Sequence, residues 1–348
     1  MSLDALQDRI RDAAARSSAL ELRGGGSKRF FGNAAQGELL DTRGYAGITD
    51  YEPSELVLTA RCGTPLVEIE ETLARNAQCL AFEPPHFGAA TFGGCIAAGL
   101  SGPRRASAGA LRDFVLGVKL IDGRGRVLEF GGRVMKNVAG YDISRLVAGS
   151  LGTLGLVAEA SLKVLPAPRA ERTRRLEMSE ARALEAMNRW AGEPLPVSAT
   201  AWHQGALHIR LSGSEPALAA ALSRIGGEDL PDGAAWWRAL REQAHPFFAG
   251  DEDLWRIAVP SITAPLELGA PLLEWHGALR WLRATGNSAQ VRDAAKRAGG
   301  HATLFRARQK PDGAFAPLDP VLARLHRALK EAFDPAGIFN RGRLYPDL

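Results

Sequence analysis

The stretch GGRVMKNVAGYDISRLVAGSLGTLGLVAEASLKVLP (residues 131–166) does most to decide the fold of this chain. Asp142 is placed to cap a short helix, which is expected to end in a loop with repeated glycines before a strand begins. Backbone amides in such a loop, together with nearby hydroxyls, are typical ligands of a phosphate or a ribose. The candidate ligand-binding residues are Gly149, Gly152, Thr153 and Gly155, with Lys136 and Asn137 in a turn upstream. Alternatively, these residues only cap the helix and start the strand.

A second glycine-rich loop lies near the start of the chain, in LRGGGSKRFFG (residues 22–32). A strand that runs into three consecutive glycines lets successive N–H groups converge, because glycine accepts positive φ without steric cost. Such a nest binds a pyrophosphate oxygen, with Ser27 as a further donor and Arg23 as a source of positive charge. The loop is not a GxGxxG fingerprint, because Arg29 stands at its last glycine, and the chain has no GxxxxGK[ST] motif. A plain surface turn is the alternative interpretation.

The segment between the two loops, FEPPHFGAATFGGCIAAGLSGPRRASAGALRDFVLG (residues 82–117), is dominated by small residues. A backbone with so few side chains can approach a flat ligand closely, and residues 80–110 are expected to form a long functional loop. The candidate residues here are Gly93, Gly94, Ala97 and Ser101, with Arg104, Arg105 and Arg112 able to reach phosphates. A tight crossover with solvated arginines is the alternative.

Periodicity along the rest of the chain predicts a mixture of helices and strands, and hence an α+β fold. Residues 166–175, PAPRAERTRR, mark a shift of composition that we interpret as a linker between domains. Helices are expected at 4–16, 64–76, 142–148, 179–192, 215–225, 287–298 and 320–333. Strands are expected at 19–23, 52–62, 113–122, 126–132, 156–166, 197–202, 205–212, 271–275 and 301–307. The helix at 320–333 is expected to bury Val321, Leu322, Leu325, Leu329 and Phe333.

Composition excludes several classes of protein. The 348 residues include 46% hydrophobic and 24% charged residues, typical of a globular protein with a sizeable core. A net charge of +4, without a concentrated basic run, argues against nucleic acid as a partner. The three cysteines form neither a disulfide framework nor an iron–sulfur ligand set, which favours a reducing, cytoplasmic location. The chain shows no signal peptide or transmembrane segment, and its seven histidines form no metal motif.

The order of the three segments resembles a known family. RGGGS, then TFGG…SG…LRDFVLG, then KNVAGYD…GSLGTLGLVAEASLKVLP is similar to the FAD-binding domain of vanillyl-alcohol oxidase, p-cresol methylhydroxylase (PCMH) and the 2-hydroxyacid dehydrogenases. The similarity covers roughly residues 15–166. EWHGALRWL (274–282) and FDPAGIFNRGRLY (333–345) further resemble the FAD-binding subunit of bacterial glycolate oxidases.

The resemblance implies a PCMH-type FAD-binding domain of two subdomains over residues 1–166. A smaller α+β cap domain would follow at 167–318, and a C-terminal helix and tail at 319–348 would return to the flavin domain. It adds Val157, as the adenine partner, and Asn340 to the binding residues. From the motifs and the resemblance together, the full set of expected cofactor-binding residues is Arg23, Gly24, Gly25, Gly26, Ser27, Gly93, Gly94, Ala97, Ser101, Arg104, Arg105, Arg112, Lys136, Asn137, Gly149, Gly152, Thr153, Gly155, Val157 and Asn340.

The resemblance also implies a function: oxidation of glycolate to glyoxylate by a complex with a sister FAD-containing subunit and an iron–sulfur subunit. The complex would be cytoplasmic or peripheral at the inner membrane. One alternative is a self-sufficient FAD-dependent 2-hydroxyacid dehydrogenase of the D-lactate type. Another is a non-catalytic assembly subunit with a vestigial flavin site, which would expose apolar patches and hold no flavin.

Two positions depart from relatives of this kind. Ser27 stands where relatives with a covalently tethered flavin often have His, so we expect FAD to be held non-covalently. His276 stands where the close family is expected to have a small residue such as Gly. No catalytic residue emerges, although oxidation of a 2-hydroxy acid calls for an arginine that pairs with its carboxylate. The candidates for this arginine are Arg280, Arg283, Arg306, Arg308, Arg341 and Arg343, and spacing does not choose among them.

Overall fold

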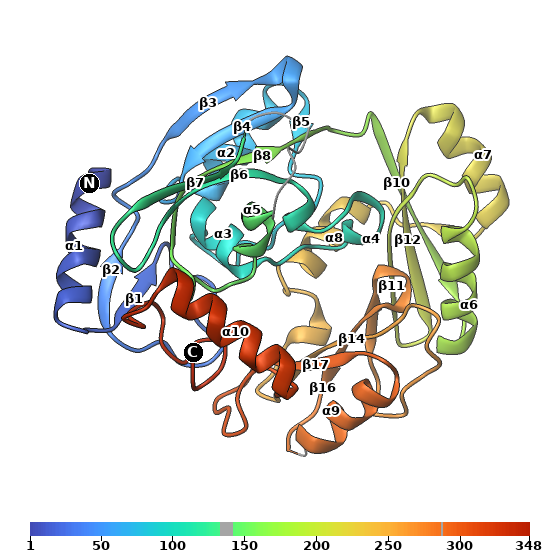
Figure 1. Cartoon of the computed structure of the whole chain (residues 1–348). Coiled ribbons are helices and arrows are strands. Elements are labelled where there is room, and N and C mark those ends of the chain that lie inside the picture. The colour runs from blue at the N-terminus through green and yellow to red at the C-terminus, as the bar shows by residue number, and fades with distance from the viewer. Residues whose placement is uncertain (133–141, 287) are drawn as a thin grey trace.

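The computed structural model describes residues 1–132, 142–286 and 288–348, and within them two antiparallel sheets form the framework of an α+β fold (Figure 1). The five-stranded sheet consists, in spatial order, of β3 (Ile48–Glu52), β4 (Val57–Arg61), β8 (Leu156–Lys163), β6 (Val115–Ile121) and β7 (Val127–Gly131). The eight-stranded sheet consists of β13 (Glu228–Asp229), β10 (Ala170–Glu177), β12 (Ala206–Gly213), β11 (Val197–His203), β15 (Leu272–Glu274), β16 (Leu279–Arg283), β14 (Leu254–Ala258) and β17 (His301–Arg306).

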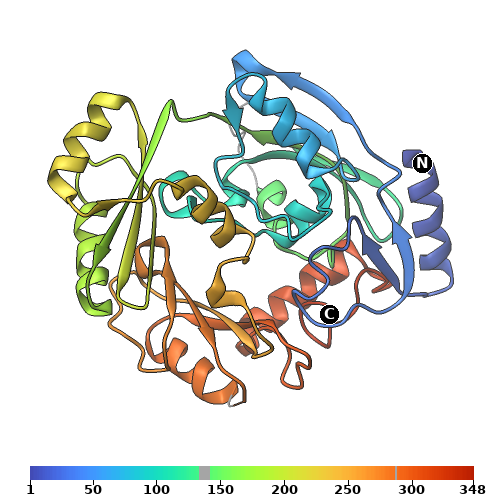
Figure 2. The ribbon, with the colours of Figure 1, turned by 180° about the vertical axis from the view of Figure 1, so that it is seen from behind.

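Helices flank both sheets. Those beside the five-stranded sheet are α1 (Leu3–Ala15), α2 (Leu66–Ala74), α3 (Phe92–Ala98) and α5 (Ile143–Leu146), whereas the short helix α4 (Arg105–Ala108) reaches across to β11 of the eight-stranded sheet. Those beside the eight-stranded sheet are α6 (Glu180–Ala191), α7 (Glu215–Ile225), α8 (Gly233–Arg241) and α9 (Ser288–Arg297). Helices α6 and α7 cover the outer face of this sheet, whereas α8 lies between the sheet and the N-terminal half (Figures 1 and 2). In the part of the chain described, no helix is long and apolar enough to cross a membrane.

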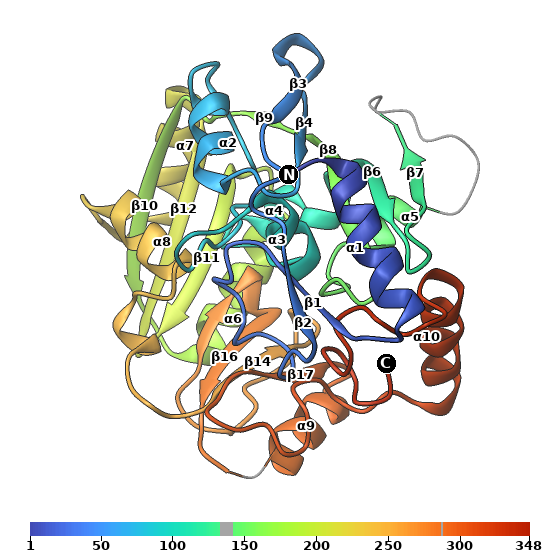
Figure 3. The same ribbon diagram turned by 90° about the vertical axis from the view of Figure 1, so that its left-hand side faces the viewer.

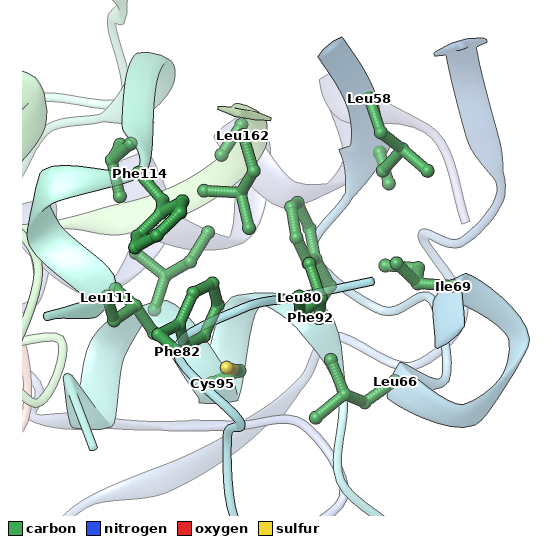
Figure 4. Packing of buried hydrophobic residues seen from close by; sticks show 14 of the residues in the cluster. Leu58, Leu66, Ile69, Leu80, Phe82, Phe92, Cys95, Leu111, Phe114 and Leu162 are labelled. Atoms are coloured by element: carbon green, nitrogen blue, oxygen red, sulfur yellow. The ribbon is translucent and has the colours of Figure 1, made fainter. Parts of the chain in front are cut away.

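The five-stranded sheet owes its stability to an apolar core between its inner face and helices α2 and α3. Leu58 on β4 and Leu162 on β8 are adjacent across the sheet, since the two residues pair in the antiparallel register. They meet Leu66 at the start of α2 and Phe92 at the start of α3, and all four side chains are fully buried (Figure 4). Burial of this kind contributes about 1.5–3 kcal/mol for each large apolar side chain, and it fixes α3 beside the sheet.

The chain returns to its own beginning after the second sheet. Helix α10 (Pro320–Phe333) crosses below the N-terminal half, and the tail after it runs beside β1 (Leu20–Arg23) (Figure 1). The Leu20 N–H donates to the Ile338 carbonyl at 2.7 Å, and the Asn340 N–H donates to the Leu20 carbonyl at 2.9 Å. On its other side β1 pairs in parallel with β2 (Glu38–Asp41), so β1 is held between two segments. Figure 3 shows β1, β2 and α10 on the same side of the molecule.

The halves meet in an apolar cluster on the inner face of the eight-stranded sheet. Phe31, Leu100 and Leu151 from the N-terminal half pack with Trp281 and Phe305 of β16 and β17. The ring centroids of Phe31 and Phe305 lie 5.1 Å apart, and those of Trp281 and Phe305 lie 5.0 Å apart. Aromatic pairs at such distances add to the area that they bury. The inner face of the second sheet is therefore held firmly against the N-terminal half.

Two local expectations from the sequence are wrong. Residues 80–110 are not a continuous loop, because the small residues let α3 lie against the neighbouring backbone. A Cβ at Gly93 would stand 2.6 Å from the Cβ of Cys62, so this close approach requires glycine. The segment 166–175 is not a plain linker, since most of it belongs to β10, which pairs with β12 from Ala170–Gly213 to Glu177–Ala206. Its arginines lie on a strand and pair with acidic residues such as Glu215 and Asp229.

Helix α10 also differs from expectation, because its apolar residues are not its buried ones. Val321, Leu322 and Leu325 are 55%, 44% and 53% exposed, whereas Leu329 and Phe333 are half-buried and Phe333 packs against the core of the five-stranded sheet. The buried residue of this helix is Lys330, whose ammonium donates to Asp334 Oδ2 at 2.7 Å and to the carbonyl of Phe339 at 2.8 Å. The helix is thus held at its C-terminal end, by Phe333 and by a buried, hydrogen-bonded charge pair, while the apolar residues of its first two turns stay exposed.

Candidate functional site: a cleft lined by two glycine loops

The two glycine-rich loops lie on either side of one cleft in the N-terminal half. The cleft has two adjoining hollows of about 590 and 400 Å³, counting the open space at their mouths. They share part of their lining, including Gly24, Gly94, Leu151 and Asn340. The first hollow continues past residues 24–29, and the second continues towards Val157 on β8. The cleft therefore has the elongated form that a dinucleotide requires.

The loop after β1 can only be built from glycine. A Cβ at Gly25 would stand 1.5 Å from the carbonyl oxygen of Ala89, and a Cβ at Gly24 would stand 2.0 Å from Thr91 Oγ1. Gly26 has φ of +71°, a conformation that side-chain-bearing residues rarely adopt. The strand thus leads into a bare turn whose backbone faces the cleft. This is the type of turn that binds phosphate through backbone N–H groups.

Thr91, at the N-cap of α3, was not among the residues expected from the sequence. Its side chain is buried, and its Oγ1 has no hydrogen-bond partner among the residues that the structure describes. It also fails to cap its own helix. A buried hydroxyl without a partner costs about 1–3 kcal/mol, so its position beside Gly24 and Gly94 suits a donor reserved for an anionic ligand. The only sequence signal for it is a hydroxyl directly before the Phe-Gly-Gly run.

The basic residues of this loop are largely engaged within the protein. Arg23 donates to Glu21 at 2.9 and 2.5 Å, and Arg29 lies 3.0 Å from the same carboxylate. Burial opposes ionisation of Glu21, but these two arginines outweigh burial and hold its pKa below the ordinary value. Burial lowers the pKa of Lys28, whose ammonium donates to the carbonyl of His86 at 3.1 Å. These side chains therefore hold the loop in shape more than they supply free charge.

Asn340 joins the two loops. Its Oδ1 accepts from the Leu22 N–H at 2.8 Å, and its Nδ2 donates to the Leu151 carbonyl at 2.6 Å. Gly152 has φ of +73°, and a Cβ there would stand 2.8 Å from the same Nδ2. Arg343, a few residues along, is buried and donates to the Lys28 carbonyl at 3.2 Å. The tail thus braces both walls of the cleft.

The structure brings most of the expected binding residues to this cleft. They are Arg23, Gly24, Gly25, Gly26, Ser27, Gly93, Gly94, Ala97, Gly152, Gly155, Val157 and Asn340. Lining residues outside the expected binding set include Glu21, Cys62, Thr91, Ala98 and Leu151, together with Arg343, which the sequence had suggested for a substrate carboxylate instead. The mixture of close glycines and an unpartnered buried hydroxyl fits a pyrophosphate-containing ligand.

The other expected residues lie elsewhere. Ser101 accepts from the Leu111 N–H at 3.0 Å and lines a separate hollow. Arg105 lies over the ring of Trp275. Gly149 closely approaches Gly99 behind α3, and Thr153 Oγ1 donates to the Ser150 carbonyl at 2.8 Å. The backbone N–H of Arg104 donates to Glu83 at 3.0 Å, and the exposed Arg112 lies beside Asp113. Lys136 and Asn137 fall outside the described residues.

His276 has a backbone conformation that explains why a small residue was expected there. Its φ of +58° lies in the left-handed region, which glycine adopts without strain. The Thr200 hydroxyl accepts from its N–H at 3.0 Å and compensates in part. Across the residues that the structure describes, no three histidine, cysteine, aspartate or glutamate side chains come together in a way that could hold a metal ion.

Comparison with known proteins agrees with this geometry. Residues 1–131 match the family described as FAD binding domain. Solved structures of alkyldihydroxyacetonephosphate synthase share the fold at a TM-score of 0.68 over 97% of this chain and 75% of theirs, with 16% sequence identity. Glycolate oxidase subunit GlcD of Bacillus subtilis (strain 168) is 32% identical over 126 residues, which are 36% of this chain and 27% of that protein.

A second relative covers nearly the whole chain. Glycolate oxidase subunit GlcE of Escherichia coli (strain K12) is 48% identical over 346 residues, or 99% of this chain and 97% of that protein. The aligned residues span both glycine loops, the second sheet and the returning tail. The chain therefore belongs to the family of the glycolate oxidase subunit GlcE, with an FAD-binding domain of the PCMH type.

Proposed function

We propose that this chain is the FAD-binding subunit of a glycolate oxidase complex, in which glycolate is oxidised to glyoxylate and electrons pass to a partner iron–sulfur subunit. The observation that carries the proposal is the cleft between the two glycine loops, in a chain similar to GlcE over almost its whole length. The proposed domain boundaries at 166/167 and 318/319, and any peripheral contact with a membrane, rest on the resemblance.

The proposed roles follow the two ends of the cleft. The backbone of residues 24–26, with Ser27 and Thr91, would hold the pyrophosphate, because glycine N–H groups and hydroxyls are its natural donors. Val157 and Gly152 would line the adenosine end. Bound FAD supplies a hydride acceptor, which the side chains of a protein do not provide. The chain's own contribution at this cleft is binding and orientation.

We further propose that FAD is held non-covalently. Among the described residues that line the two hollows there is neither a histidine nor a tyrosine. The thiol of Cys62 does line one hollow, but burial raises its pKa to about 12, so it is a poor nucleophile. Ser27, at the position where a tethering histidine was considered, carries a hydroxyl that is unreactive without a base.

A partner is needed for the electrons to leave. The three cysteines are free thiols, and three are too few for the four-cysteine set of a typical iron–sulfur cluster. An external acceptor with its own cluster is therefore the natural complement. The exposed apolar residues Val321, Leu322 and Leu325 on α10 agree with a chain that works inside a complex, which both the proposed subunit and the alternative assembly subunit require.

The proposal is tested by the visible spectrum of the purified full-length chain. We expect a flavin spectrum, and we expect acid precipitation to release the flavin into the supernatant as FAD. If the chain neither copurifies with flavin nor binds it on titration, the proposal is refuted and a vestigial flavin site is favoured. If anaerobic glycolate bleaches the flavin of the chain alone, the self-sufficient 2-hydroxyacid dehydrogenase is the better assignment.

A further inference from the structure

A separate hollow lies between the N-terminal half and the inner face of the eight-stranded sheet. One wall is the turn at residues 101–103, and the opposite wall is formed by β14, β15 and β16. Its volume is about 340 Å³, counting the open space at its mouth. Apolar side chains such as Phe87, Leu279 and Phe305 supply much of its lining. Sites for small molecules commonly combine such a lining with a few well-placed polar groups.

Arg256 is the first polar group of this hollow. It stands on β14, opposite Trp281 on one neighbouring strand and Thr303 on the other. Its guanidinium lies 5.1 Å from the ring centroid of Trp275, and the guanidinium of Arg105 lies 4.5 Å from the same ring. Among the described residues, neither side chain donates a hydrogen bond or forms an ion pair. Burial, with a smaller contribution from Arg105, lowers the pKa of Arg256 to about 10.

Glu274, the second polar group, lies at the end of β15. Its side chain is 4% exposed, and its Oε1 accepts from Trp281 Nε1 at 2.7 Å. No described residue donates to Oε2. Burial raises the pKa of this carboxyl to about 7, although the Trp281 hydrogen bond and the charge of Arg256 oppose the change. Arg256 and Glu274 both line the hollow, yet they do not form an ion pair with each other.

All six arginines that the sequence suggested for a carboxylate are already engaged within the protein. Arg280 donates to the carbonyls of Gly277, Thr263 and Ala264. Arg283 lies 3.0 Å from Glu252, Arg306 donates to Gln243 at 2.8 Å, and Arg343 donates to Lys28 and Asn33. Arg308 is 82% exposed and paired with Asp251, and Arg341 donates to backbone carbonyls such as that of Ser17. The donors of Arg256, which the sequence did not suggest, are not taken up by any residue that the structure describes.

We propose that this hollow binds a small 2-hydroxy carboxylate, whose carboxylate pairs with Arg256 and whose hydroxyl donates to Glu274 Oε2. A guanidinium presents two parallel donors that match a carboxylate, and a desolvated one without an acceptor favours an anion strongly. A carboxyl with a free oxygen accepts a hydroxyl proton in a hydrogen bond. The choice of glycolate as the probe rests on the proposed function, whereas the site itself rests on the two unpaired groups.

The experiment is isothermal titration calorimetry of the purified, FAD-loaded full-length chain with glycolate and, separately, with acetate, which lacks the hydroxyl. We expect one glycolate per chain and weaker binding of acetate. Replacing Arg256 by Met should weaken glycolate about tenfold to a hundredfold, because hydrogen bonds to charged groups contribute most to such binding. Arg256→Lys should retain part of the affinity, because an ammonium keeps the charge without the paired donors. Arg308→Met, at the exposed pair with Asp251, is the matched control and should bind as the parent does.

Glu274→Gln tests the second contact. The amide oxygen can still accept from Trp281, but its other group is a donor, so the preference for glycolate over acetate should shrink. Absence of glycolate binding by the parent chain, or unchanged binding by Arg256→Lys and Arg256→Met, would overturn the inference. If Arg256→Met does not fold, Arg256→Lys alone decides. Retained FAD without glycolate binding refutes this site only, whereas loss of both FAD and glycolate refutes the proposed function.

Discussion

Replacing Thr91 by Val should weaken FAD binding while leaving the empty protein at least as stable. The two side chains have nearly the same shape, so the change removes one hydroxyl and little else. This hydroxyl is buried and no described residue hydrogen-bonds to it, so its loss from flavin-free protein should be neutral or should stabilise the fold by roughly 1 kcal/mol. A hydrogen bond to a charged phosphate contributes about 1.5–3 kcal/mol, which corresponds to a loss of affinity of roughly tenfold to 150-fold.

The assay has two parts: titration of flavin-free protein with FAD, followed by fluorescence, and urea unfolding of the flavin-free protein. Thr59→Val is the matched control, because its Oγ1 hydrogen-bonds with Ser161 Oγ at 2.8 Å inside the five-stranded sheet, away from the cleft. It should lower the free energy of unfolding by about 1 kcal/mol or somewhat more and leave FAD affinity unchanged. The reasoning is refuted if Thr91→Val binds FAD with the affinity of the parent.

Three further changes test other parts of the structure. Gly25→Ala should abolish or greatly weaken FAD binding, since its Cβ would meet a carbonyl oxygen at 1.5 Å. Gly213→Ala on β12 is the control, because its Cβ would make only an ordinary contact of 3.6 Å with Pro196, and it should retain the flavin spectrum. Asn340→Ala should lower both FAD affinity and the thermal midpoint, because the amide links both glycine loops; a variant with parental FAD affinity would contradict this. The contribution of Glu274 to stability should fall as pH rises from about 4.5 to about 7, by up to about 3 kcal/mol, because folding raises its pKa and the native state holds a proton that the unfolded chain releases. Burial lowers the pKa of His208 to about 4, and this group acts in the opposite direction over an overlapping range, so the test is the difference between the parent and Glu274→Gln in urea unfolding. The stability of the parent relative to Glu274→Gln should fall with rising pH, and a difference that stays constant would contradict the assignment.

The features that the sequence predicted best are local ones. The turn at Gly24–Gly25–Gly26 and the cap at Asp142, whose side chain accepts from the Arg145 N–H, depend on φ and on hydrogen bonds between near neighbours. Strand and helix periodicity likewise located the hairpin of β6 and β7. Such signals are contained in a few consecutive residues, so they can be recognised without knowledge of the remainder of the fold.

The features that the sequence missed depend on contacts between distant segments. Helix α10 has an apolar stripe that normally indicates a buried face, yet its burial is decided by Lys330 and by where the tail runs. The sequence does not show which arginines of the C-terminal half find an acidic or carbonyl partner. Arg256 can be recognised as unpaired only once the second sheet is placed against the N-terminal half. Thr91 likewise cannot be told from other threonines in the sequence, because what distinguishes it is its contact with Gly24, which is distant in sequence.

The hydrogen bond between Asn340 and Leu22 joins residues 318 positions apart. The loop that it closes is nearly the longest that this sequence allows, and the entropy of closing a loop must be offset before its contacts contribute. Residue 340 is also synthesised after both glycine loops. The contact that braces both walls of the cleft therefore forms only after nearly the whole chain has been made, and a chain cut short before residue 340 would lack it.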